Sequence, residues 1–149
     1  MVRLVDEGVF PRSREQLWKF LDLHTADDVI HSIHRGVLDQ RTLSTSGEEI
    51  LLARTLDARG KARAVRWKIT AHRPDWIRWE IVEAPEGPMA LGSYLLNRYS
   101  DDPGGTRVQT ESEIRIVGVP GFLQKRVVRG VLAEIDREDL AYLAAHPEL

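Results

Sequence analysis

The most constraining feature of this sequence is one long amphipathic segment that follows a series of strand-length segments. Between residues 37 and 117 the hydrophobic pattern alternates with a period of two, and after residue 120 it changes to the helical period. About seven antiparallel strands form a sheet about 30 Å broad, whereas a helix of about 22 residues is roughly 10 Å wide. One helix cannot cover this sheet. The sheet must therefore curl around the helix, and any unfilled volume becomes an internal cavity.

Regularly spaced turn residues, including those at 85–88, separate the strand-length segments. The predicted strands are 2–10, 37–43, 48–57, 62–72, 76–83, 90–100 and 106–117. Short connections make sequence neighbours antiparallel. The clearest alternation places Val108, Thr110 and Ser112 on one face and Gln109 and Glu111 on the other. One face of the sheet is therefore expected to contact solvent.

Two short helices are predicted between the first two strands. Ser13 and Gln16 form a capping-box pattern, and Thr25 with Asp28 repeats the N-cap pattern ahead of a helix that ends near His34. The long helix begins near Pro120. Its apolar stripe comprises Leu123, Val127, Val128, Val131, Leu132, Ile135, Leu140 and Leu143.

The composition is that of one domain, residues 1–149, and it excludes several classes of site. The chain contains no cysteine, which excludes thiol nucleophiles, zinc–thiolate sites and iron–sulfur clusters. Its net charge of -2 and the lack of a basic run argue against a nucleic-acid partner. No segment approaches the roughly 20 apolar residues of a membrane span. We expect a cytoplasmic protein without stable membrane insertion, and a homodimer is left open.

Three further segments carry a family resemblance. They are Gly92-Ser93-Tyr94, the hairpin through Gly104-Gly105-Thr106, and Val117-Gly118-Val119-Pro120-Gly121 before the long helix. With this order of elements the whole chain resembles the START-related, Bet v 1-like (SRPBCC) superfamily, which includes polyketide cyclase and aromatase-like proteins and lipid-transfer-like proteins. The resemblance implies an α+β helix-grip fold with a deep apolar cavity. It implies no universal catalytic residue, and we expect no cofactor.

The expected ligand-binding residues lie on the inner face of the sheet, on the long helix and at the pocket mouth. The set is Trp67, Ile69, Trp79, Ile81, Tyr94, Leu96, Thr110, Ser112, Val127, Val131, His31 and His34. Large aromatic side chains on such a face either fill the core or line a cavity. Small hydroxyl groups there either bond to neighbours or offer polar contacts to a ligand.

Four polar residues have two interpretations each. His24, His31 and His34 lie close in sequence, and His31 and His34, three residues apart, could begin a metal site, but nothing nearby marks a third ligand. We therefore expect no metal, and we place these histidines in solvent at helix ends or at the pocket mouth. Arg54 would need an anionic partner, such as a ligand carboxylate, if it faced inward. The favoured register instead places Arg54 in water.

The leading functional hypothesis is binding or transport of a small hydrophobic molecule, such as a lipid, an isoprenoid or a polyketide-like compound. The alternative is a cyclase or aromatase-like enzyme that uses Tyr94, Ser112 or a histidine at the mouth for proton transfer in the same cavity. A third class is a protein-interaction module with an incidental cavity. Catalytic residues stay unassigned, because the sequence supplies no definite ionisable group inside the pocket.

Overall fold

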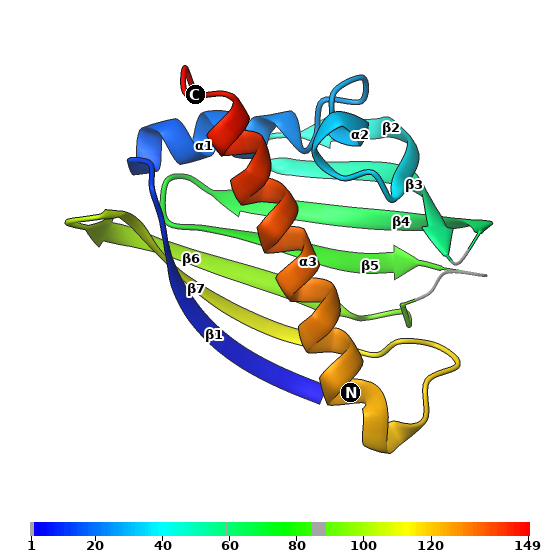
Figure 1. The fold of residues 1–149 in the computed structure, drawn as a ribbon. Coiled ribbons are helices and arrows are strands. Elements are labelled where there is room, and N and C mark those ends of the chain that lie inside the picture. Colours follow the sequence, from blue (N-terminus) through cyan, green and yellow to red (C-terminus); the bar gives the residue numbers. More distant parts are fainter. Residues whose placement is uncertain (1, 59, 85–88) are drawn as a thin grey trace.

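The computed structural model describes residues 2–58, 60–84 and 89–149, so the predicted turn at 85–88 lies outside the described residues. One seven-stranded antiparallel sheet curves around a long helix that crosses its concave face (Figure 1). In chain order the elements are β1 (Val2–Phe10), α1 (Arg14–Leu23), α2 (Ile30–Ile33), β2 (Val37–Ser46), β3 (Glu49–Ala58), β4 (Lys61–His72), β5 (Trp76–Glu83), β6 (Tyr94–Asp102), β7 (Gly105–Ile114), the 3-10 turn η1 (Gly121–Leu123) and α3 (Gln124–Ala145). This arrangement is the helix-grip fold, which confirms the predicted fold class.

Local sequence signals account for most of these boundaries. The backbone N–H of Gln16 donates to Ser13 Oγ at 3.2 Å, and the Ser13 N–H donates to Gln16 Oε1 at 3.0 Å, so the predicted capping box starts α1. The Thr25–Asp28 cap is wrong, because α2 begins only at Ile30 and has no side-chain cap. The strand predicted from residue 90 begins at Tyr94, because the chain turns at Gly92 with a φ of 82°.

Strands β1 and β7 pair along their whole length and place the start of α1. The register runs from Val2 opposite Ile114 to Phe10 opposite Thr106. Gly105 has a φ of 137°, and a Cβ atom there would lie 2.1 Å from the Phe10 carbonyl oxygen. Only glycine allows this close approach. It brings the segment before α1 against the start of β7.

Helix α3 is buried mainly near its two ends. Its buried residues are Gln124, Val128, Asp139 and Leu143, whereas Val131 in the middle is 37% exposed. The predicted apolar stripe is therefore not one continuous core contact. None of the helices in the described residues is both long enough and apolar enough to cross a membrane.

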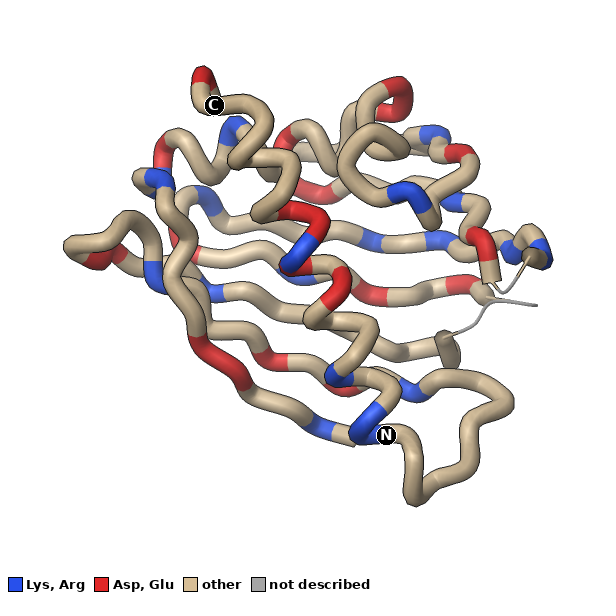
Figure 2. The backbone as a smooth tube through the Cα atoms, viewed as in Figure 1, with Lys and Arg blue, Asp and Glu red and all other residues tan. Residues whose placement is uncertain are grey.

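Charged residues are spread over the strands and over α3 (Figure 2). On the outer face, Arg3 pairs with Glu111 at 2.8 Å across β1 and β7. The inner face supplies the core, in which Leu52, Val65 and Ile81 are at most 1% exposed. The burial of Val65 and Ile81 confirms the alternation predicted for β4 and β5.

Candidate functional site

A cavity of about 770 Å³ lies between the concave face of the sheet and α3. Its volume falls within the range of about 300–1,000 Å³ that is typical of small-molecule sites. The apolar part of its wall includes Phe10, Leu17, Phe20, Leu56, Trp67, Trp79, Leu95, Val108, Val127, Val131 and Ile135. The curl of the sheet around one helix therefore leaves the hollow that the sequence pattern requires.

The expected ligand-binding residues divide into four groups. Those that line the cavity are Trp67, Trp79, Thr110, Val127, Val131 and His34. Ile69, Ile81 and Ser112 are buried at 1%, 1% and 0% exposure but lie outside the cavity wall. His31 is exposed at the surface.

Tyr94 and Leu96 make up the fourth group, because they occupy the outer phase of β6. The Tyr94 hydroxyl donates to Glu111 Oε2 at 3.0 Å, and the Arg78 guanidinium lies 4.6 Å from the centre of the Tyr94 ring. The expectation that Tyr94 faces inward is therefore wrong. Leu95, between them, pairs with Trp79 and faces the cavity. Apolar side chains occur at both alternating sets of positions in β6. Periodicity alone could therefore not predict which set faces the interior.

Arg54 faces inward, so the favoured register of β3 is also wrong. Its Nε donates to Gln40 Oε1 at 2.6 Å and its Nη2 donates to the His24 carbonyl oxygen at 3.0 Å. Its guanidinium carbon lies 4.8 Å from the centre of the Trp79 ring. Burial lowers the pKa of Arg54 to about 10, while the charge of Asp139 acts in the opposite direction. The cavity wall therefore carries a positive charge at neutral pH.

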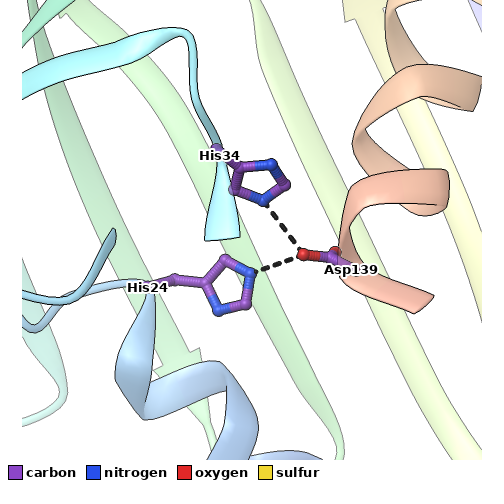
Figure 3. A group of neighbouring side chains, drawn as sticks. All are labelled: His24, His34 and Asp139. Carbon is purple, nitrogen blue, oxygen red and sulfur yellow. Dashed lines mark hydrogen bonds and ion pairs between the residues drawn. The ribbon is translucent and has the colours of Figure 1, made fainter. Parts of the chain in front are cut away.

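Two histidines and an aspartate meet in the cavity wall near α1 and α2 (Figure 3). His24 follows the last residue of α1, His34 follows the last residue of α2, and Asp139 projects from α3. Asp139 Oδ1 lies 2.9 Å from His24 Nε2 and 3.0 Å from His34 Nε2. The three residues are 7%, 9% and 8% exposed. The solvent-exposed interpretation is therefore wrong for His24 and His34.

The second nitrogen of each imidazole also faces an oxygen. His24 Nδ1 lies 3.1 Å from the Phe20 carbonyl oxygen, and His34 Nδ1 lies 3.2 Å from Glu138 Oε1. The other Glu138 oxygen accepts a hydrogen bond from the Arg35 N–H at 3.2 Å. A neutral imidazole carries only one N–H. All four ring nitrogens face oxygen atoms, but two neutral imidazoles carry only two N–H groups between them. The two remaining nitrogen–oxygen contacts are favourable only if the cluster gains positive charge.

The electrostatics of the cluster favour an imidazolium–carboxylate pair. Burial acts to lower the pKa of His34, but hydrogen bonds and charges from Asp139 and Glu138 outweigh it and raise that pKa above its ordinary value. Burial acts to raise the pKa of Asp139, but hydrogen bonds from His24 and His34 outweigh it and lower that pKa. Each group therefore stabilises the charged form of the other.

Asp139 was missed at the level of the sequence, although a signal was present. It lies four residues after Ile135 and four before Leu143, so a carboxylate interrupts the apolar stripe of the long helix. Its partner His24 is 115 residues away in the chain. No local pattern links positions so far apart, so only the fold brings them together.

Two more polar atoms in the cavity wall lack partners. Trp67 Nε1 and the Tyr99 hydroxyl have no hydrogen bond of standard geometry among the described residues. Asn97 lies two residues before Tyr99 in β6. Its Oδ1 accepts a hydrogen bond from Thr110 Oγ1 at 2.7 Å. Burial raises the pKa of Tyr99, so its hydroxyl is neutral and can donate. A buried donor without an acceptor is costly, and a bound molecule or water can satisfy it.

No family model matches the chain, and no curated protein matches it. Solved structures do match. The chain is similar to Ara h 8.0201, with a TM-score of 0.77 and 14% identity over 97% of this chain and 99% of that one. It is similar to a START superfamily protein from Mycobacterium smegmatis, with a TM-score of 0.76 and 9% identity over 96% and 97% of the two chains. A third match is the Zhui aromatase/cyclase from Streptomyces sp. R1128, with a TM-score of 0.70 and 11% identity over 99% and 93%. These likenesses confirm the resemblance at the level of the fold.

Proposed function

From the helix-grip fold and its hollow interior, we propose that this chain binds a small hydrophobic molecule, such as a lipid, an isoprenoid or a polyketide-like compound. The observation that carries the proposal is the cavity of about 770 Å³ under α3. A close-packed interior has few voids larger than a water molecule, so an apolar cavity of this size supports the binding of a ligand there. A cytoplasmic location and the absence of a nucleic-acid partner belong to the same proposal.

Aromatic rings in the wall favour a ligand with apolar or planar parts. The Trp67 and Trp79 rings meet edge to face, with centres 5.8 Å apart, and both line the cavity. Aromatic pairs of this kind present large, rigid apolar surfaces. They also give the site its own optical probe, because a ligand against either indole changes its fluorescence.

Polar groups in the same wall favour a ligand that carries oxygen atoms. Arg54 is buried, positively charged and without a carboxylate in direct contact among the described residues. Trp67 and Tyr99 also line the cavity, and Trp67 Nε1 and the Tyr99 hydroxyl are buried donors without a partner among the described residues. A molecule with a hydrophobic body and a carboxylate or carbonyl group matches both the apolar and the polar parts of the cavity wall.

The test is a fluorescence titration of the full chain with pairs of probes that differ only in their polar end. We expect saturable quenching or enhancement with a fatty acid, and weaker binding of the fatty alcohol of equal length. Val131→Phe should weaken binding, because its ring occupies part of the cavity, and it should leave the fold intact because Val131 is 37% exposed. Leu140→Phe is the matched control, since this residue is on α3 but outside the cavity wall.

Either of two results would contradict the proposal. One is a flat titration across fatty acids, isoprenoid alcohols and polycyclic aromatic probes. The other is equal binding by Val131→Phe and the wild-type chain. Native mass spectrometry of the purified protein supplies an independent readout, because a co-purified molecule adds its own mass.

A second candidate function is acid–base catalysis on the bound molecule, and one solved structure that the chain resembles in fold is named an aromatase/cyclase. The observation that favours it is the buried His24–Asp139–His34 cluster in the cavity wall. Tyr94 is unsuited to this role because its hydroxyl bonds to Glu111 on the outer face. Incubation with a linear poly-β-carbonyl chain should then yield a cyclised product with loss of water. His34→Gln should bind the chain without converting it.

A further inference from the structure

The cluster of His24, His34 and Asp139 brings three donor atoms close together, from α3 and from the residues that directly follow α1 and α2 (Figure 3). One ligand atom from each residue can be chosen so that all lie within 4.8 Å of one another. We propose that His24 and His34, through their Nε2 atoms, and Asp139, through its carboxylate, bind one divalent transition-metal ion. This inference reverses the sequence-based expectation that no metal binds.

The two distances between Asp139 and the histidines fit such an ion. Metal–nitrogen and metal–oxygen bonds of about 2.0–2.2 Å at angles of roughly 90–110° place neighbouring donor atoms about 3.0–3.4 Å apart. Asp139 Oδ1 lies 2.9 Å and 3.0 Å from the two Nε2 atoms. An ion between the three atoms therefore requires an outward shift of the carboxylate and an adjustment of the two imidazole side chains.

The surroundings of the imidazoles match those of metal ligands. A histidine that binds a metal almost always donates its other ring N–H to a carboxylate or a backbone carbonyl. Here His24 Nδ1 faces the Phe20 carbonyl oxygen and His34 Nδ1 faces Glu138, which the Arg35 N–H holds in place. When an ion replaces the protons between Asp139 and the two rings, these contacts hold the hydrogen on Nδ1 and leave each Nε2 lone pair for the ion.

The charges balance as well. With neutral imidazoles, Asp139 and Glu138 contribute two negative charges, and the nitrogens that face Asp139 have no hydrogen to donate. One divalent ion supplies the two positive charges that two further protons would otherwise bring. Arg54 adds a positive charge nearby, but its own hydrogen bonds go to Gln40 and the His24 carbonyl oxygen.

The donor set also limits the kind of metal. Imidazole nitrogens suit zinc, iron, cobalt, nickel and copper, whereas calcium and magnesium prefer oxygen ligands only. Three protein ligands leave at least one coordination position, and all three residues line the cavity. The open position therefore faces the interior, where a water molecule or an oxygen atom of a bound molecule can occupy it.

The experiment uses untagged full-length protein, freed of metal with a chelator, and titrates it with Co²⁺ and Zn²⁺. We expect one Co²⁺ per chain with visible absorption bands, and a Tm that rises with Zn²⁺ concentration. His34→Gln and Asp139→Asn should each lower the Co²⁺ affinity by more than about 100-fold, and Glu138→Gln by about 10- to 100-fold. His31→Gln is the matched control, because this exposed histidine lies three residues from His34 and should leave the affinity unchanged.

The proposal is overturned if the wild-type chain shows no saturable binding, if His31→Gln weakens binding as much as His34→Gln does, or if folded His34→Gln and Asp139→Asn retain it. Nuclear magnetic resonance of the wild-type histidine side chains gives an answer that needs no variant. Zn²⁺ should shift the Nε2 signals of His24 and His34 and leave those of His31 and His72 in place. If only the signals of His31 and His72 shift, the proposal is overturned. Ligand binding by tryptophan fluorescence is measured separately, so either function can fail without the other.

Discussion

Near the first turns of α3 the interior is built from Leu4, Ile114 and Val128, whereas near α1 and α2 it holds His24, His34 and Asp139. The first group is held together by apolar contact, which has no preferred direction and scales roughly with buried area. The second group is held by hydrogen bonds and charges, which depend on having every partner in place. The two ends of one cavity therefore differ in how they respond to the loss of a single residue.

The largest expected effect is at the polar end. Asp139→Ala leaves two buried histidines without their shared carboxylate, and removal of one partner from a buried ion pair costs about 3–5 kcal/mol. The midpoint of urea denaturation should fall accordingly. Glu134→Ala, an exposed acid on the same helix, should change the free energy of unfolding by no more than about 0.5 kcal/mol. Equal effects of the two substitutions would show that the cluster contributes nothing to stability.

A smaller effect is expected at the apolar end. Leu4 is 5% exposed, and Leu4→Ala should cost about 2–3 kcal/mol through lost burial and a new void. Val5→Ala is the matched control, because the neighbouring side chain is 53% exposed. A loss at Leu4 no greater than that at Val5 would show that this end of the interior is not packed.

The smallest effect is a pH dependence confined to the polar end. In chelator, the raised pKa of His34 gives stability that is complete below about pH 6.5 and is lost as the pH rises through the folded-state pKa. The lowered pKa of Asp139 gives stability that is present above about pH 3.9 and is lost as the pH falls through its folded-state pKa. Urea midpoints should therefore form a plateau between these limits.

Two variants separate the ends of the cavity in the same pH series. Asp139→Asn should flatten the dependence, because it removes the charge that both histidines face. Leu4→Ala should lower every midpoint by a similar amount and keep the shape of the curve. If Leu4→Ala flattened the curve instead, the two ends would not be independent.

The same contrast explains what could be predicted from the sequence. The alternation in β7 and the capping box of α1 are local patterns, and both were predicted correctly. The facing of Arg54 could not be predicted, because its inward position depends on Gln40 and the His24 carbonyl oxygen, which belong to other parts of the chain. The histidine cluster depends on a contact across 115 residues. Apolar burial leaves a local periodic pattern, whereas no local pattern identifies the partners of these polar contacts.

The attachment of α3 near its two ends has a consequence for how this fold can diverge. Gln124, Val128, Asp139 and Leu143 hold the helix, whereas Val127 and Val131 face the hollow. Residues that anchor the helix and residues that shape the cavity are thus largely separate sets. Substitutions at cavity-lining positions of α3 can therefore accumulate under selection for a new ligand. The stability of the fold stays above the level needed for function, because the anchoring residues are unchanged.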